Sequence, residues 1–458
     1  MSAEQYDLIV IGAGSAARDG AGKAKREHGA NVAMIERERW GGSCPNVACR
    51  PTKAYLTAAE LVHDVNQEAE RRGIRVSKAE IDLARLRSWK DSIRRDQESW
   101  LELLSDTYTA LRGEASFVDQ HTVRVAGNEL TGDRILIASG SRTAVPSIPG
   151  IEHVTWIDHV SALQLERVPE SLLVIGAGPV GLEFAQIFAR FGSRVVIVSH
   201  GTQIAARNDT EAAEELQAAL EDEGIEVILT DGGVERFARE GERIEATITG
   251  GRTVTVTDVL LASGRVPNVE ELRLDRIGVD VSRGGIVVDG RQRTSVPGIW
   301  AAGDCAVGPM FTPTAQYQAR VAVDDMFGSG DRRAEYDALA TAIFTDPELG
   351  GVGLTEAEAR DRGHDVDVVK HPLAAVTRAQ YFGNRRGLYK IVFDRSTRRV
   401  LGVHVVSRGA SDIVGGLAAA LKLGATVDDL AHVHHVYPSY SEGVKAAAEQ
   451  ALTGAVAA

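Results

Sequence analysis

Two cysteines, Cys44 and Cys49, are the residues of this chain best placed by their surroundings to do chemistry. They lie in Trp40-Gly-Gly-Ser-Cys-Pro-Asn-Val-Ala-Cys-Arg-Pro-Thr-Lys53, a segment that leads into a helical pattern from Ala54 to about Ala69. The positive end of that helix, with the basic residues beside it, would stabilise a thiolate. Four residues between the cysteines do not fit a C-x-x-C zinc site, and the sequence has no second pair to complete one. The pair therefore predicts redox or thiolate chemistry, the alternative being two inert buried cysteines.

A strand, a glycine turn and a helix are expected twice along the chain. The first copy reads Leu8-Ile-Val-Ile-Gly-Ala-Gly-Ser-Ala-Ala17 and the second Leu172-Leu-Val-Ile-Gly-Ala-Gly-Pro-Val-Gly181. Each is followed by a second apolar run, Val32–Ile35 and Val195–Val198. In G-x-G-x-x-G/A the glycines allow a tight turn and a close approach of the backbone to a pyrophosphate at the helix N-terminus. Two copies with matched return strands predict two parallel-sheet domains that each bind a dinucleotide.

The residues that end the two return strands differ. Glu36 ends the first, where a carboxylate accepts hydrogen bonds from a ribose diol that carries no 2′-phosphate. The second ends at Ser199 and His200 with no acid, and Arg194 and Arg207 are nearby in sequence. This end favours a nucleotide with a 2′-phosphate, NADPH, while NADH stays possible. The alternative is that Ser199 only caps a loop and that both arginines are solvated.

Taken together, these motifs resemble those of the class I pyridine nucleotide-disulfide oxidoreductases, which include dihydrolipoamide dehydrogenase, glutathione reductase and mercuric reductase. The resemblance extends along essentially the whole chain. It rests on Gly41–Lys53, which is similar to the family's G-G-T-C-x-N-x-G-C-x-P-[ST]-K, and on the segments at 137–141, 261–268, 298–304 and 344–356.

The resemblance implies a bound FAD in the first dinucleotide site and a nicotinamide cofactor in the second. Cys49 would be the thiolate against the flavin and Cys44 the thiol that meets the substrate, while Lys53 and Glu183 would form an ion pair beside the flavin. The residues implied for FAD are Gly12, Gly14, Glu36, Gly42, Ser43, Lys53, Ala115, Ser139, Gly140, Asp304 and Ala315. Those implied for NADPH are Gly176, Gly178, Val180, Gly181, Glu183, Ser199, His200, Arg207 and Gly264.

Further expectations concern the chain after the second glycine motif. Asp304 would hold the ribityl or pyrophosphate part of the flavin. Thr312 and Pro313 predict an N-cap followed by proline at the first helical position, so this helix could direct its positive end at a reduced, anionic flavin. Cys305 has no partner cysteine within sequence reach and is expected to be a small buried filler.

The C-terminal part departs from the disulfide-reducing members of the family, which have H-P-T-x-S-E near the end. Here Tyr437 stands at the His position and Glu442 is retained. Tyr has an unperturbed pKa of about 10 and His of about 6.5, so Tyr437 would be the poorer proton shuttle at neutral pH. The segment Tyr437–Lys445 is similar to mercuric reductase, but the C-terminal cysteine pair of that enzyme is missing, so efficient transfer of Hg(II) is not expected. Three histidines precede the segment as a polar loop, a metal cluster or a displaced base: His432, His434 and His435.

The predicted fold is α/β, with two Rossmann-like dinucleotide-binding domains and a C-terminal α+β dimerisation domain. The FAD domain is expected at 1–150 and 266–335, the NAD(P)H domain at 151–265, and the dimerisation domain at 336–458. A homodimer follows from the resemblance, because the family completes its site with the partner subunit.

The composition disfavours nucleic-acid-binding, membrane-spanning and secreted proteins. The 458 residues carry 51 Lys and Arg against 64 Asp and Glu, a net charge of −13, which disfavours nucleic acid as a partner. No run of 18 apolar residues occurs, and the acidic N-terminus lacks the basic start of a signal peptide. Three cysteines are too few for a disulfide scaffold, so a cytoplasmic location without membrane partners is expected.

The sequence therefore predicts an FAD-dependent NAD(P)H oxidoreductase, similar to mercuric reductase, with a redox-active disulfide between Cys44 and Cys49. The acceptor would be a metal ion, a quinone or another small electrophile, and no resident metal is expected. One alternative is a low-molecular-weight disulfide reductase or a dihydrolipoamide dehydrogenase-like enzyme in which Tyr437 or His435 replaces the missing base. Another is a flavoprotein subunit or redox sensor.

Overall fold

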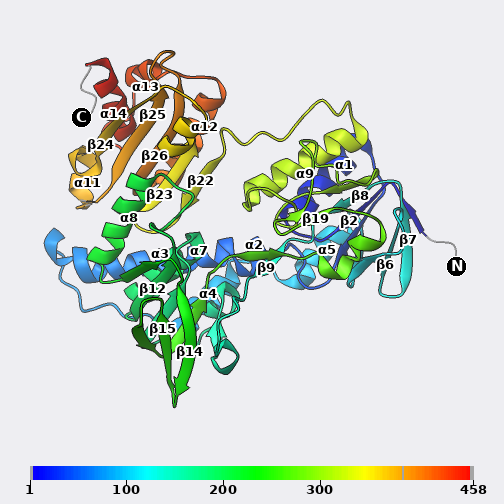
Figure 1. The fold of residues 1–458 in the computed structure, drawn as a ribbon, viewed down its shortest axis with the longest axis horizontal. Coiled ribbons are helices and arrows are strands. Elements are labelled where there is room, and N and C mark those ends of the chain that lie inside the picture. The colour runs from blue at the N-terminus through cyan, green and yellow to red at the C-terminus, as the bar shows by residue number, and fades with distance from the viewer. Residues whose placement is uncertain (1–3, 384–385, 454–458) are drawn as a thin grey trace. The chain divides into compact units, whose positions relative to one another are not determined.

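The computed structural model describes residues 4–383 and 386–453, which form two compact units (Figure 1). The first unit comprises Met1–Pro51, Ser88–Ala144 and Gly264–Glu335, and the second comprises Thr52–Arg87, Val145–Ser263 and Tyr336–Ala458. Thr52–Arg87, which the sequence assigned to the FAD domain, belongs to the second unit. The three-domain division itself stays a prediction.

The first unit is built on a five-stranded parallel sheet. Its order is β21-β8-β2-β3-β4, so the strand before the first glycine turn lies in the middle, between its return strand and β8. The bounds are β2 Leu8–Ile11, β3 Val32–Glu36, β4 Thr109–Arg112, β8 Ile135–Ile137 and β21 Ile299–Ala301. All four residues of β2 are buried, as expected for a strand covered on both faces.

Helices and a second sheet cover this parallel sheet. Helices α1 (Ser15–His28) and α9 (Thr312–Phe327) lie side by side, and a side chain at Gly20 of α1 would clash with Leu136 of β8 (Figure 1). The four-stranded sheet β1-β7-β6-β5 has the bounds β1 Glu4–Tyr6, β5 Ala115–Phe117, β6 Thr122–Val125 and β7 Asn128–Gly132. Short strands β9 (Ser141–Thr143) and β18 (Arg265–Pro267) pair, as do β19 (Val281–Ser282) and β20 (Gly285–Ile286).

The second unit repeats the plan of the first. Its parallel sheet has the order β10-β17-β11-β12-β13, with the strand before the second glycine turn again in the middle. The bounds are β10 Trp156–Ile157, β11 Ser171–Ile175, β12 Arg194–His200, β13 Glu226–Thr230 and β17 Asp258–Leu261. Helices α7 (Pro179–Arg190) and α8 (Thr210–Asp222) pack on one face of it, and an antiparallel sheet of β14 Val234–Glu240, β15 Arg243–Ile248 and β16 Arg252–Val256 packs on the other.

The C-terminal part of the second unit is an antiparallel sheet with helices. Its order is β22-β23-β26-β25-β24, with bounds Ala340–Ile343, Glu348–Gly353, Val400–Ser407, Leu388–Asp394 and Val366–Pro372. Its helices are α10 Glu356–Asp361, α11 Thr377–Phe382, α12 Ala410–Lys422, α13 Val427–His432 and α14 Glu442–Leu452. The predicted α/β class, with two Rossmann-like sheets and a C-terminal α+β part, is confirmed.

The helix through the redox segment begins and ends earlier than expected. Helix α3 begins at Cys49 itself and ends at His63, followed by a π-helical turn at Asp64–Glu68. A short helix, α2 (Ser43–Val47), precedes it, and α4 (Leu83–Ser92) and α5 (Gln97–Ser105) follow. No helix among the described residues is long and apolar enough to cross a membrane.

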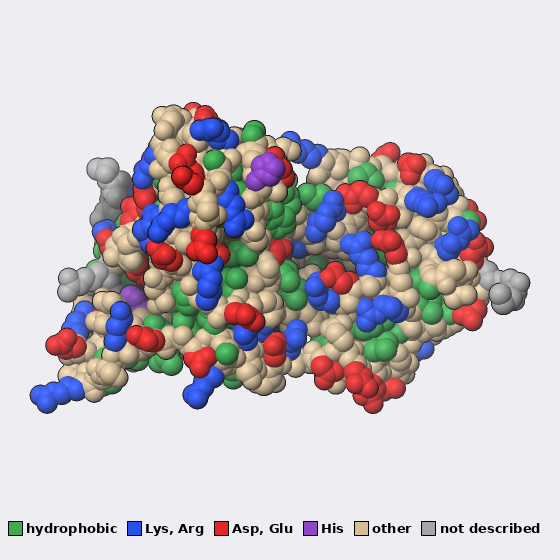
Figure 2. Space-filling view, turned by 90° about the horizontal axis from the view of Figure 1, so that it is seen from below, with side chains coloured by type: hydrophobic (Ala, Val, Ile, Leu, Met, Phe, Trp, Pro, Cys, Tyr) green, Lys and Arg blue, Asp and Glu red, His purple; other side chains and the backbone are tan. Residues whose placement is uncertain are grey.

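Surface charge is mixed. Figure 2 shows acidic and basic side chains interspersed over the face that it draws. Such a face differs from the continuous basic stripe that is typical of nucleic-acid binding.

The second glycine turn predicts unequal effects of two neighbouring substitutions. A Cβ at Gly181 would overlap the carbonyl oxygen of Gly176, whereas a Cβ at Gly178 would meet nothing within 4 Å. We expect Gly181→Ala to lower the free energy of unfolding by about 2–3 kcal/mol, and Gly178→Ala to change it by less than about 1 kcal/mol. Urea unfolding of both variants, followed by circular dichroism, tests this. Equal stability of the two variants would contradict it.

Candidate functional site

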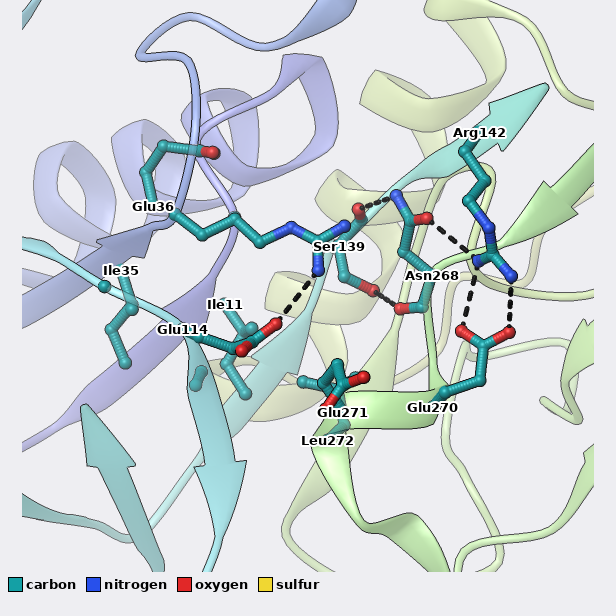
Figure 3. A pocket seen from close by; sticks show the side chains of 14 residues that line it. Ile11, Ile35, Glu36, Glu114, Ser139, Arg142, Asn268, Glu270, Glu271 and Leu272 are labelled. Carbon is teal, nitrogen blue, oxygen red and sulfur yellow. Dashed lines mark hydrogen bonds and ion pairs between the residues drawn. The ribbon is translucent and has the colours of Figure 1, made fainter. Parts of the chain in front are cut away.

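The first glycine turn opens onto a cavity of about 420 Å³ in the first unit (Figure 3). Four residues predicted to bind FAD line it: Gly12, Glu36, Ala115 and Ser139. The turn is tight because Gly12 has φ +112° and its N–H donates to Ile35 at 2.7 Å. A side chain at Gly12 would overlap the carbonyl of Ala138, so only glycine fits here.

Glu36 is anchored at the end of β3 by three backbone donors. Its Oε2 accepts the N–H of Ala13 at 2.9 Å, and its Oε1 accepts those of Glu38 and Arg39 at 2.7 and 3.0 Å. A carboxylate has about four acceptor positions, so one stays open toward a ribose hydroxyl.

The other side of this cavity is formed by the segment after β18. Ser139 and Asn268 exchange two hydrogen bonds, Ser139 Oγ to Asn268 O at 2.7 Å and Asn268 Nδ2 to Ser139 O at 3.1 Å (Figure 3). Arg142 donates to both oxygens of Glu270 at 3.1 and 2.7 Å, and its hydrogen bonds lower the pKa of Glu270 to about 2. Arg142 and Glu270 were not predicted as lining residues, because no motif joins positions that are 128 residues apart.

Asp304 follows β21 and is fixed by neighbours of its own unit. Ser141 Oγ donates to its Oδ2 at 2.7 Å, and Arg265 Nε lies 3.4 Å from the same oxygen. Cys305 beside it is fully buried, and its thiol donates to the carbonyls of Ile137 and Ala302. This burial agrees with the predicted filler role.

Cys44 and Cys49 lie at the starts of two successive helices. Cys44 is the second residue of α2 and is half-buried, while Cys49 is the first residue of α3 and is exposed. Cys49 Sγ lies 3.7 Å from Thr312 Oγ1, at the start of α9. The predicted N-cap at Thr312 is wrong by one residue: Phe311 is the N-cap and has no side-chain oxygen, so the Thr312 hydroxyl is left to meet the sulfur.

A close backbone contact fixes the redox segment against the first glycine turn. Gly42 has φ +76°, and a side chain there would overlap the Cα of Gly14. Asn46 holds the segment from the other side, since its Nδ2 donates to the carbonyls of Trp40 and Gly42 at 2.8 and 2.7 Å. The predicted FAD residues Ser43, Gly140 and Ala315 belong to the same unit.

Lys53 and Glu183 form the ion pair that the resemblance implied. Lys53 Nζ donates to both oxygens of Glu183 at 2.9 and 2.8 Å, and it lies 4.2 Å from the centre of the Phe344 ring. Glu183 is only 5% exposed and also accepts the N–H of Phe344 at 3.1 Å. Phe344 had not been singled out as a site residue. The role of the pair toward a flavin stays a prediction.

The second glycine turn matches the first in its hydrogen bonds. Gly176 N–H donates to Val198 at 2.8 Å, as Gly12 does to Ile35. Ala177 N–H donates to Ser199 Oγ at 3.2 Å, where the first copy has Ala13 and the Glu36 carboxylate. Ser199 therefore occupies the structural position of Glu36. Val180, on α7, is half-buried.

The surroundings of Ser199 correct one expectation. Arg194 begins β12 and donates to the carbonyl of Thr255, at the opposite end of the strand from Ser199, so it is not near this position. His200 ends the strand, with its Nδ1 3.2 Å from Asp231 O, and Arg207 is exposed. Gly264 belongs to the first unit, unlike the other predicted NADPH residues.

The C-terminal residues form a local network around His435. His435 Nδ1 lies 3.0 Å from Ser441 Oγ, which lies 2.9 Å from Ser439 Oγ, and Glu442 accepts the N–H of Ser439 at 2.8 Å. Burial lowers the pKa of His435, so its imidazole is neutral at pH 7. Tyr437 is 70% exposed.

The histidine run does not assemble into a metal site. The described residues hold no group of three His, Cys, Asp or Glu side chains that could bind a metal ion. His432 Nδ1 instead lies 2.7 Å from the carbonyl of Asp428.

The first unit fits a flavin dinucleotide on its own geometry. The cavity, the glycine-only contacts at Gly12 and Gly42, and the open position on Glu36 suit a pyrophosphate and a ribose diol. If FAD binds, Glu36 would hold the ribose, and Asp304 is placed to accept from a further hydroxyl.

Comparisons with known proteins agree with this geometry. The profile of the family described as pyridine nucleotide-disulphide oxidoreductase matches residues 6–319, and that of its dimerisation domain matches residues 339–448. The chain is 36% identical to a mercuric reductase of Lysinibacillus sphaericus, over 97% of this chain and 82% of that one. It is 38% identical to a dihydrolipoyl dehydrogenase of Thermus scotoductus, over 97% of both chains.

A solved structure is also similar. The Cu(II) complex of the HOCl-induced flavoprotein disulfide reductase RclA from Escherichia coli matches with a TM-score of 0.86 and 29% identity. The match covers 97% of this chain and 99% of that one.

The buried ion pair predicts a stability effect that depends on both partners. Lys53→Met leaves the Glu183 carboxylate buried without its cation, so we expect a loss of about 1–3 kcal/mol in the free energy of unfolding. Adding Glu183→Gln should recover at least half of this loss, because the amide can still accept from Phe344. Arg124→Met, which breaks an exposed pair with Glu129, is the control and should cost less than about 0.5 kcal/mol. A double variant no more stable than Lys53→Met would contradict the interpretation.

Proposed function

Because the chain belongs to the pyridine nucleotide-disulfide oxidoreductases and is an FAD-dependent enzyme of that type, we propose that it takes electrons from NADPH and passes them through the Cys44–Cys49 pair to a small acceptor: a metal ion, a quinone or another electrophile. The observation that carries this proposal is the position of the two sulfurs at the starts of α2 and α3, with Cys49 beside Thr312. When bound, FAD supplies the two-electron carrier between the nicotinamide and the cysteines.

The cysteines and their neighbours account for the rest of the reaction. A hydride brings two electrons and one proton, and the two electrons break the sulfur–sulfur bond. Cys49 is then left as a thiolate at the positive end of α3, and Cys44 takes the proton as a thiol. The reduced pair passes both electrons to the acceptor, Cys44 releases its proton, and the disulfide forms again. Cys44 is the sulfur that would meet the acceptor.

The nucleotide preference follows from one position. Ser199 stands where Glu36 stands in the first copy, and it brings no carboxylate to repel a 2′-phosphate. The exposed Arg207 adds a cation in the loop after β12. We therefore favour NADPH over NADH.

A homodimer is part of the proposal. The dimerisation-domain profile covers residues 339–448, and large apolar side chains are left exposed there, among them Leu423 at 87% and Val436 at 78%. A second copy of the chain would cover such side chains.

A second candidate function is the reduction of small disulfides. It is favoured by the neutral His435 and its serine neighbours, because a neutral imidazole can accept the proton of an attacking thiol. The matched Escherichia coli structure carries the name of a disulfide reductase, which fits this candidate. We rank it second because Tyr437 stands where the disulfide-reducing members have their histidine.

Turnover with defined acceptors separates the two candidates. We expect NADPH oxidation with Cu(II) or a quinone under nitrogen, with Hg(II) as a further arm in which turnover should be weaker because the C-terminal cysteine pair is missing, and His435→Gln should change turnover by less than about threefold. Cys44→Ala should lower turnover with the metal ions by at least about 100-fold. Strong turnover with small disulfides that is lost in His435→Gln would favour the second candidate. No turnover with any acceptor, despite full flavin loading, would instead indicate a redox sensor.

Ser199→Glu tests the nucleotide preference. The new carboxylate can accept from Ala177 as Glu36 accepts from Ala13, and it would repel a 2′-phosphate. We expect the ratio of kcat/KM for NADPH to that for NADH to fall by about 10–100-fold. Arg194→Met, at the other end of the same strand, should leave the ratio unchanged. An unchanged ratio in Ser199→Glu would show that position 199 does not select the nucleotide.

A further inference from the structure

Arg18 lies on α1, directly after the first glycine motif, and no part of the proposed function uses it. The backbone N–H of Arg18 donates to the carbonyl of Gly14 at 3.0 Å. Gly14 is the residue against which Gly42 of the redox segment packs. The start of α1 and the segment that holds Cys44 are therefore in direct backbone contact.

The guanidinium of Arg18 is held in place by an aromatic ring. It lies 4.7 Å from the centre of Trp100, which is itself buried. The same indole packs on the redox segment, because a side chain at Gly41 would clash with its ring. Trp100 thus contacts both Arg18 and the residue three positions before Cys44. A cation stacked on an aromatic face keeps its charge and loses mobility.

Among the described residues, no acidic side chain forms an ion pair with Arg18. Its Nε is buried and has no hydrogen-bond partner among the described residues. Asp19, the next residue, is bound to Arg320 of α9 through both oxygens at 2.7 and 2.9 Å. Burial lowers the pKa of Arg18, and Coulombic attraction to Cys44 opposes that shift ahead of attraction to Asp19. An arginine stays protonated at any pH at which the protein is folded.

Other charged or titratable groups lie around this place. The Tyr108 phenol has its pKa raised by burial and stays neutral, while Arg26 is exposed two turns further along α1. Arg95 also lies over Trp100, at 5.4 Å, farther from the ring centre than Arg18 at 4.7 Å. Arg50 and Arg94 donate to backbone carbonyls, those of Ile93 and Asn46.

We propose that Arg18 is a positioning residue of the redox centre, whose fixed positive charge stabilises the thiolate form of Cys44. The reduced pair would then hold a larger fraction of Cys44 as the nucleophilic thiolate at neutral pH, which is the form that reacts with an electrophilic acceptor. This inference rests on the proposed function only in taking Cys44 as the sulfur that meets the acceptor.

Alkylation of Cys44 tests the charge without any turnover. In a Cys49→Ser background, the rate of iodoacetamide labelling of Cys44 is measured against pH by mass spectrometry, with the buried Cys305 as a slow internal reference. Arg18→Met removes the charge and keeps a straight apolar side chain over Trp100. We expect it to raise the midpoint of the labelling curve by about one pH unit and to lower the rate at pH 7 by up to about tenfold.

Three further variants make the result specific. Arg18→Gln should shift the midpoint as Arg18→Met does, so the test survives if one of the two fails to fold. Arg18→Lys should keep the midpoint of the parent, and Arg26→Gln, which removes a cation elsewhere on α1, should do the same. An unchanged midpoint in both uncharged Arg18 variants would overturn the proposal, and so would an equal shift in Arg26→Gln or Arg18→Lys. Failure of the proposed function would show as lost turnover with the labelling shift intact.

Discussion

Close contact between backbones at the ends of buried strands is the constraint on which the rest of this structure depends. At Gly12 and at Gly176 the chain turns with φ above +100° directly against the carbonyl of a neighbouring segment, where a side chain would overlap. Each turn then starts a helix whose N–H groups are free to meet a phosphate. The same glycine turn before a helix occurs twice in the chain, so the two expected dinucleotide sites share one local structure.

The redox segment uses the same kind of contact. Gly42 packs on Gly14, and this fixes the start of α2 against the first glycine turn. The contact with the first glycine turn therefore helps to fix the positions of Cys44 and Cys49. Cys49 gains the positive end of α3 and the hydroxyl of Thr312, whereas Cys44 follows Gly41, which packs against Trp100, the ring on which Arg18 stacks. The two sulfurs thus have different electrostatic surroundings, as two different roles require.

Much of this could be predicted from the sequence, because glycine motifs and buried apolar strands are local patterns. The matched return strands at Val32 and Val195 are found where the periodicity places them. The pairing of Lys53 with Glu183 came from the family resemblance, since no spacing rule links positions 130 residues apart.

The features that the sequence did not reveal depend on contacts between distant segments. Trp100 contacts Gly41 and Arg18, which are 59 and 82 residues away in sequence, and nothing in its local sequence indicates this. Arg194 looked close to Ser199 in sequence, but an extended strand carries the two residues to opposite ends. The start of α9 was misplaced by one residue because Thr312 is a typical cap residue, whereas the structure uses its hydroxyl against Cys49.

Counting electrons tests the central claim most directly. Anaerobic titration of the FAD-loaded protein with dithionite should consume about four electrons per chain, two for the flavin and two for a Cys44–Cys49 disulfide, and about two in Cys44→Ala. A wild-type protein that is fully reduced by about two electrons, the same as Cys44→Ala, would contradict a redox-active cysteine pair.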